Sequence, residues 1–289
     1  MAAGWVDRAL SAMVYLGEPI VHPTLDFVAT RLRSQWPRWI YRAASELGFK
    51  QVAAIFSRHA VDDLIEAMDR NGISHTVVCA IEPFFLSEPI ASALAPHPDR
   101  FSFFCAIDPF HPDPAQRLAE IMAAFPVHGL KIHPTLTGLH PHDDRMFALL
   151  ELARHNHLPV TIHTGTFPFD TGGWDDATLL EPALAAYPDV TIVLAHIGWD
   201  QYRKVIDLAS RHPHVAVETS WQPARVIKMA VQALGADRVY FGSDFPLLRQ
   251  EFALSHVRQA LSDEEYEMVV SRNAMRLLGL GLVGQARTA

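Results

Sequence analysis

Short apolar runs rich in β-branched residues recur along the chain, and segments with helical spacing separate them. Nearly continuous apolar runs are typical of parallel strands that are buried on both faces and covered by helices. Eight runs occur, at residues 18–24, 74–80, 101–108, 128–134, 158–164, 190–196, 214–220 and 238–244. Helices are predicted at residues 60–72, 113–125, 144–156 and 222–235 and from Ser262 onward. This alternation over 289 residues predicts an α/β fold, a single (β/α)8 TIM barrel.

Two segments fall outside the alternation. Residues 1–19 are predicted to form an amphipathic leader helix before the first strand. Residues 25–60, between the first and second runs, are predicted to be a helical insertion that serves as a lid or as one wall of a site. The whole chain, residues 1–289, is assigned to one domain.

The composition excludes several classes of function. The net charge is −8 and basic residues do not cluster, which argues against a nucleic-acid partner. No apolar stretch reaches the roughly 18 residues that a membrane helix needs, so no membrane partner is expected either. Cys79 and Cys105 lie inside strand-like runs and are predicted to be buried free thiols of a cytoplasmic protein.

Metal-binding side chains gather near the ends of the predicted strands. In a barrel of this kind the chemistry lies at the carboxyl ends of the strands, which meet around one small space. The residues in question are His22, His133, His163, His196 and Asp244. Imidazole and carboxylate ligands suit zinc, with manganese or iron(II) as alternatives. Because the chain has 16 histidines, it is position that selects these four.

Neighbouring residues are candidates for substrate contact. Lys131 and His133 are two positions apart and therefore face the same way on a strand. Lys131, or Arg58 at the end of the insertion, is suited to pair with a substrate carboxylate. Trp199 follows His196 closely and can pack against a flat substrate. These residues predict a small-molecule substrate that carries a carboxylate.

The motifs at the strand ends resemble those of a known family. GLKIHP, VTIHTG, VLAHIGW, VAVETS and FGSDFP occur in this order over about residues 60–280. This set resembles the amidohydrolase-2 group of the amidohydrolase superfamily, which contains barrel hydrolases and decarboxylases related to aminocarboxymuconate semialdehyde decarboxylase. The resemblance implies one divalent metal, with His22, His163 and Asp244 as ligands and His196 acting beside the metal. It also implies, by analogy, a possible homodimer.

The first strand departs from the pattern of that family. Where members carry two histidines separated by one residue, this chain reads His22-Pro23-Thr24. Three protein ligands and a water still make a sound catalytic zinc site, and Asp26 lies close enough in sequence to contribute. The departure leaves three outcomes open: weaker metal binding, catalysis without metal, or a barrel that has lost its activity.

The expected function is hydrolysis of a small carboxylated lactone, ester or amide. A metal-bound water would be the nucleophile, Asp244 would take its proton, and His196 would polarise the substrate carbonyl. Zn²⁺ is the expected ion and Mn²⁺ the alternative. The same residues suit non-oxidative decarboxylation of an unsaturated or aromatic acid. A third reading is a non-catalytic or metal-independent barrel.

Overall fold

Nine parallel strands form one closed sheet in the computed structural model, which describes residues 10–14, 61–166 and 173–280. The strands follow the order β8-β7-β6-β5-β4-β3-β2-β1-β9. Their bounds are β1 Leu10–Val14, β2 His75–Cys79, β3 Phe101–Ala106, β4 Gly129–Ile132, β5 Val160–Ile162, β6 Ile192–Leu194, β7 Val215–Glu218, β8 Val239–Tyr240 and β9 Gly242–Phe245. Only Phe241 separates β8, which pairs with β7, from β9, which pairs with β1. This last segment therefore joins the two edges of the sheet and closes the predicted barrel.

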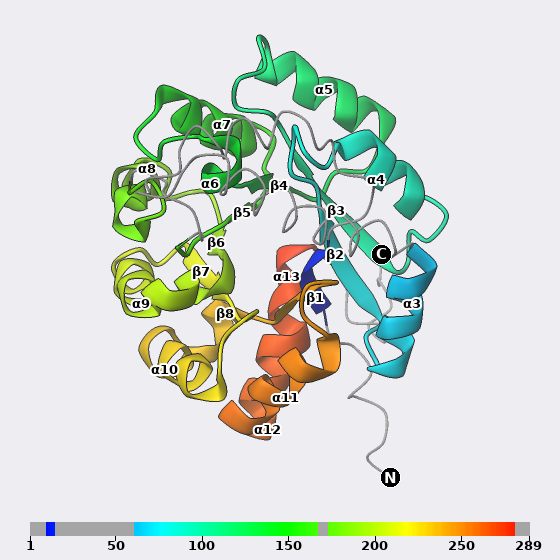
Figure 1. Ribbon diagram of the computed structural model, residues 1–289, viewed down its shortest axis with the longest axis vertical. Coiled ribbons are helices and arrows are strands. Elements are labelled where there is room, and N and C mark those ends of the chain that lie inside the picture. Colours follow the sequence, from blue (N-terminus) through cyan, green and yellow to red (C-terminus); the bar gives the residue numbers. More distant parts are fainter. Residues whose placement is uncertain (1–9, 15–60, 167–172, 281–289) are drawn as a thin grey trace, which may run out of the picture.

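Helices surround the strands on the outside of the ring (Figure 1). Their bounds are α3 Val61–Arg70, α4 Ser87–Leu94, α5 Pro114–Ala124, α6 Pro134–Thr137, α7 Asp144–His155, α8 Glu181–Ala186, α9 Tyr202–Arg211, α10 Ala224–Leu234, α11 Gln250–Ala260, α12 Asp263–Glu267 and α13 Asn273–Leu277. The helices predicted from spacing correspond to α3, α5, α7, α10 and α12. Within the described ranges, no helix is long and apolar enough to cross a membrane.

The first strand of the barrel is not where the sequence placed it. β1 spans Leu10–Val14 and pairs with both β2 and β9, so it occupies the position predicted for residues 18–24. The prediction of a leader helix over these residues is therefore wrong. A five-residue strand inside an amphipathic segment has too short a pattern to be told from a helix by periodicity. Residues 18–24 and the insertion at 25–60 lie outside the described part of the chain.

Side chains fill the interior of the barrel, and the sequence provides room for them. Every residue of β3 is buried, including Phe104 at 1% exposure. A Cβ atom at Gly129, on the neighbouring β4, would lie 2.5 Å from the ring of Phe104. Glycine at this position therefore lets a large aromatic ring lie inside the barrel. Cys79 and Cys105 are buried thiols that form no disulfide bond, as predicted.

Strand register determines which side chains reach the mouth of the barrel. Lys131 of β4 pairs with Thr161 of β5, and neighbouring residues in register point to the same face of a sheet. His133 and His163 lie two positions further along each chain, so they face inward beyond the ends of these strands. The register thus directs both histidines towards one space.

A capping box stabilises the start of α12. The Ser262 side chain accepts the Glu265 backbone N–H, and the Glu265 carboxylate accepts the Ser262 backbone N–H. We expect Ser262→Ala to lower the free energy of unfolding by about 1 kcal/mol, measured by urea denaturation. Ser255→Ala, in the exposed middle of α11, is the control and should change it by less than about 0.5 kcal/mol. An equal loss of unfolding free energy in the two variants would contradict a stabilising role of the Ser262 capping box.

Candidate active site

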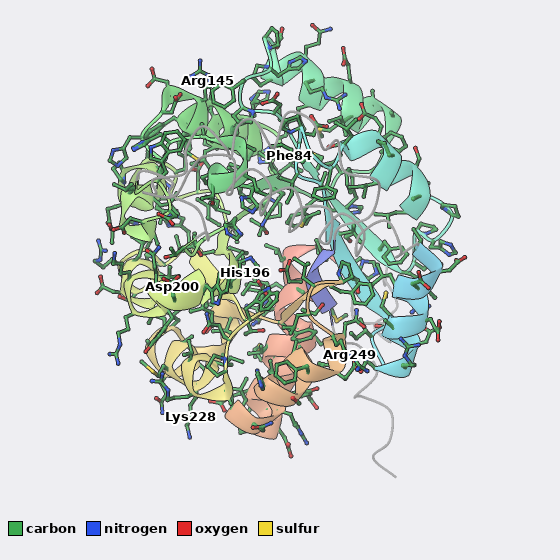
Figure 2. The ribbon with its side chains drawn as sticks, viewed as in Figure 1. Phe84, Arg145, His196, Asp200, Lys228 and Arg249 are labelled. Atoms are coloured by element: carbon green, nitrogen blue, oxygen red, sulfur yellow. The ribbon has the colours of Figure 1, made fainter. Side chains whose placement is uncertain are left out.

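Three histidines that follow three consecutive strands lie in contact at the mouth of the barrel, with His133 and His196 buried and His163 half-buried. The rings of His133 and His163 are stacked, with centroids 3.8 Å apart and planes 12° apart. His196 Nε2 lies 3.1 Å from His163 Nδ1. Figure 2 shows His196 within the ring of helices, whereas Lys228 lies at its outer edge. Burial lowers the pKa of all three imidazoles well below their usual value, so they are neutral at pH 7.

A hydrogen-bonded chain continues from His196 to the end of β7. His196 Nδ1 is 2.6 Å from Ser220 Oγ, which donates to Glu218 Oε2 at 2.8 Å. The backbone N–H of His196 donates to the same carboxylate oxygen at 3.1 Å, and the backbone N–H of Ser220 donates to Oε1. Both ring nitrogens of His196 are therefore engaged by protein partners. Glu218 is fully buried, and burial raises its pKa to about 7.

Asp244 lies at the end of β9 with one oxygen bonded and one not. The indole Nε1–H of Trp221 donates to Asp244 Oδ2 at 2.6 Å. Asp244 Oδ1 is buried and accepts no hydrogen bond from any described residue. Burial raises the pKa of Asp244 to about 6, while the Trp221 hydrogen bond and the charge of Lys131 act to lower it. An oxygen in this state suits either a cation or a proton.

Lys131 is a buried amine that connects these groups electrostatically. It is 2% exposed, and burial lowers its pKa despite the opposing effect of Asp244 and Glu218. With His133 it lines a cavity near the ends of β2, β3 and β4. Glu82, on the other wall, is paired with Arg117 at 2.7 Å. Among the residues that line this cavity, Lys131 is the one lysine or arginine.

The turns that follow β6 and β7, and β9 itself, contain backbone in the left-handed region. After β6, His196, Ile197 and Trp199 have φ values of 62°, 45° and 49°. Trp221 after β7 has φ 64°, and Asp244 in β9 has φ 55°. Such conformations cost about 1–3 kcal/mol each in non-glycine residues and cluster at functional sites.

Gln222 supports the turn after β6. Its Nε2 donates to the backbone oxygens of His196 at 2.6 Å and of Trp199 at 2.9 Å. Gly198 within the turn has φ 73°, and a Cβ atom there would lie 2.4 Å from Val205. The amide of Gln222 and the glycine together keep the strained turn in place.

The predicted residues divide into two groups. The structure brings together Lys131, His133, His163 and His196, and it places Trp199 beside Trp221, with ring centroids 6.0 Å apart. Asp244 interacts with both groups, because the charge of Lys131 acts on its carboxylate and the Trp221 indole N–H donates a hydrogen bond to it. The positions of His22, Thr24, Asp26 and Arg58 lie outside the described residues, so their roles stay predictions.

Sequence reasoning assigned no role to Trp221, Glu218, Ser220 or Gln222. Glu218 ends the buried apolar strand β7, and Ser220 lies two positions further on and faces the same way, which is a recognisable signal for inward-facing polar groups. Trp221 and Gln222 carry no such signal, because they act from turns whose backbone conformation the sequence does not reveal.

The described residues supply part of a metal site. His163 and Asp244 are two of the three predicted ligands, and the charge of Lys131 acts on both. The unsatisfied Asp244 Oδ1 fits a cation. Within the described ranges, however, no group of three or more His, Cys, Asp or Glu side chains is arranged to hold a metal ion. A complete site would need a ligand from the remainder of the chain, such as His22.

A closed barrel of eight strand positions with polar residues at the strand ends defines the class of TIM-barrel enzymes. The sequence profile of the amidohydrolase family matches residues 21–280, and the chain belongs to this family. No protein of curated function has a sequence that matches the chain significantly.

Solved structures with the same fold include decarboxylases and a hydrolase. The 5-carboxyvanillate decarboxylase of Sphingomonas paucimobilis has a TM-score of 0.70 at 15% identity, covering 95% of this chain and 100% of its own. A dihydroxybenzoic acid decarboxylase from Polaromonas, solved with bound manganese, has a TM-score of 0.66 at 15% identity, covering 95% and 97%. A probable 2-pyrone-4,6-dicarboxylic acid hydrolase from Acinetobacter baumannii has a TM-score of 0.64 at 15% identity, covering 94% and 100%.

Proposed function

We propose that the protein is a non-oxidative decarboxylase of a small aromatic or unsaturated carboxylic acid. The observation that carries this proposal is the pairing of Asp244, a buried acid of raised pKa, with the indole of Trp221, which is 37% exposed. A proton-carrying group beside an exposed aromatic face suits a flat substrate that must be protonated on carbon. Several proteins of similar fold are decarboxylases of benzoic acids, which favours this alternative over the hydrolysis expected first.

The residues at the mouth of the barrel have proposed roles in the reaction. The substrate ring lies against Trp199 and Trp221, and Lys131 with His133 binds an anionic oxygen of the substrate. Asp244 Oδ1 delivers a proton to the ring carbon that bears the carboxylate. The carbon–carbon bond then breaks, its electron pair returns to the ring, and CO₂ leaves. Asp244 remains as a carboxylate and regains its proton from water.

A divalent metal fits beside this set of residues. His163 would hold it, with His22 as a further proposed ligand, and Asp244 would add an oxygen ligand only in its ionised form, after its proton has gone to the substrate. Zn²⁺ or Mn²⁺ suits these donors. When bound, such an ion supplies Lewis-acid polarisation of a substrate oxygen.

Hydrolysis of a lactone is the second candidate. The hydrolase of similar fold supports it, and a buried acid beside neutral imidazoles suits ring opening as well as protonation of carbon. The two reactions differ in their products, because only decarboxylation releases CO₂.

The proposal is tested with purified protein in the presence of Mn²⁺ or Zn²⁺. Substrates are 2,6-dihydroxybenzoate and 5-carboxyvanillate for decarboxylation, and 2-pyrone-4,6-dicarboxylate for hydrolysis. CO₂ release and ring opening are measured in parallel, with Asp244→Asn as the inactive reference. CO₂ release from a benzoic acid that is lost in the variant supports the proposal. Ring opening without CO₂ from any substrate supports hydrolysis and contradicts decarboxylation.

Trp199→Ala tests the proposed aromatic wall. Trp199 is 45% exposed, so its loss should leave the fold intact and remove contact with the substrate ring. We expect KM for the aromatic acid to rise about fivefold, with kcat within about twofold, because stacking contributes about 1 kcal/mol. Phe252→Ala removes an equally exposed ring from α11 and should leave KM unchanged. The same KM in both variants would show that Trp199 does not contact the substrate ring.

A further inference from the structure

The chain of hydrogen bonds from Glu218 to His163 has a direction that its chemistry fixes. Glu218 accepts three hydrogen bonds, from the backbone N–H groups of His196 and Ser220 and from the Ser220 hydroxyl. The two backbone groups can only donate, so both carboxylate oxygens act as acceptors. Three donors favour the ionised carboxylate, against the effect of burial.

The single hydroxyl proton of Ser220 then decides the tautomer of His196. Because this proton is donated to Glu218 Oε2 at 2.8 Å, Ser220 Oγ must accept from its other neighbour, His196 Nδ1, at 2.6 Å. A neutral His196 that carries its proton on Nδ1 has a lone pair on Nε2. The 3.1 Å contact between that Nε2 and His163 Nδ1 is a hydrogen bond only if His163 donates.

The same reasoning fixes the tautomer of His163. A neutral His163 with its proton on Nδ1 presents a lone pair at Nε2. Histidines that bind metals usually donate their other ring N–H to a protein acceptor, which sets the ring orientation and the tautomer. His133 holds the ring plane from the other side by stacking, with its own Nδ1 accepting the Leu136 backbone N–H.

We propose that Glu218 and Ser220 are positioning residues that lock His196 and His163 in the Nδ1–H tautomer, so that Nε2 of His163 is prepared to bind a divalent cation. We call the hydrogen-bonded series Glu218, Ser220, His196 and His163 the relay. His196 connects its two ends, because one ring nitrogen contacts Ser220 and the other contacts His163. The inference rests on the proposed function only in assuming that the cation serves catalysis. Its test measures tautomers and cation binding and requires no turnover.

The tautomers are measured by long-range ¹H–¹⁵N NMR of the histidine rings in the chelator-treated protein at pH 8. This pH lies above the pKa of about 7 that burial gives Glu218. His163→Gln and His196→Gln assign the two rings by loss of their signals. The proposal expects both rings as the Nδ1–H tautomer. A proton on Nε2 of His163 in the wild-type protein would overturn it.

Substitution of the serine tests the relay itself. Ser220→Ala is expected to move the His196 and His163 signals away from the pure Nδ1–H tautomer and to weaken Zn²⁺ binding, measured by calorimetry, about 10–100-fold. Ser220→Thr keeps the hydroxyl and should restore both. Ser102→Ala is a matched control, because it removes a buried hydroxyl 2.9 Å from His75 Nε2, next to the start of β3. It should leave Zn²⁺ affinity unchanged.

The outcomes separate the relay from the proposed function. Wild-type tautomers as expected, with tighter Zn²⁺ binding than in Ser220→Ala, support the relay even if no benzoic acid is decarboxylated. A Ser220→Ala variant that binds Zn²⁺ as tightly as the wild type, or a wild-type protein that binds none, would overturn it even if CO₂ is released.

Discussion

Asp244→Asn should lower kcat for CO₂ release about 10²–10⁴-fold, the range that general acid–base groups contribute. Asparagine keeps an oxygen that can accept the Trp221 indole N–H, but it has no acidic proton for the substrate carbon. The fold should be retained, because the side-chain volume is conserved and Oδ1 accepts no hydrogen bond from the described residues. Stopped assays of CO₂ release measure kcat, and a thermal melt of the same preparation measures whether the fold is retained.

The control for this prediction is an aspartate on the surface. Asp189→Asn removes a carboxylate with a 60% exposed side chain, whose nearest cation is 3.9 Å away, and should leave kcat within about twofold. If Asp244→Asn keeps a tenth or more of the wild-type kcat, Asp244 is not the proton donor. If it loses its thermal transition, the role of Asp244 is structural.

Gly242→Ala is expected to lower the free energy of unfolding by about 3 kcal/mol, at the upper end of the cost of overpacking a core. The new Cβ atom would lie 1.8 Å from Glu218 Oε1. Glu218 is fully buried and cannot swing away without giving up hydrogen bonds to His196 and Ser220. The substitution should therefore also weaken Zn²⁺ binding, as loss of the Ser220 hydroxyl does.

Gly173→Ala provides the comparison for the glycine. It lies in open space, and its cost arises only from a φ of 88°, which we expect to be about 1–2 kcal/mol. Urea denaturation measures both variants. A loss for Gly242→Ala no larger than that for Gly173→Ala would show that Glu218 moves freely, which contradicts its role as the fixed end of the relay.

The sequence was sufficient to predict the barrel because the pattern of a buried apolar strand followed by a helix is repeated along the chain. Seven of the eight predicted runs overlap the observed strands β2 to β9, and the motif set pointed to the family that the profile confirms. The first strand was missed because Leu10–Val14 is short and its partners, β2 and β9, are distant in the chain. Its place depends on closing the ring, which local periodicity does not encode.

The site was predicted only in part, for a similar reason. Inward-facing residues such as Lys131 and His163 follow from the two-residue alternation of a strand. The contacts of Trp221 with Asp244 and of Gln222 with the turn after β6 depend on left-handed backbone at Trp221 and around Trp199. Bulky residues rarely adopt this conformation, so no sequence rule would have placed them there.

The fate of a single proton tests the proposed reaction most directly. The protein is incubated in D₂O with 2,6-dihydroxybenzoate or 5-carboxyvanillate, and the product is analysed by mass spectrometry and ¹H NMR. The account predicts one mole of CO₂ for each mole of product, with one deuterium on the carbon that lost the carboxylate, and product formation about 10²–10⁴-fold slower with Asp244→Asn. Product formed at the wild-type rate by Asp244→Asn, or a substrate consumed without release of CO₂, would contradict it.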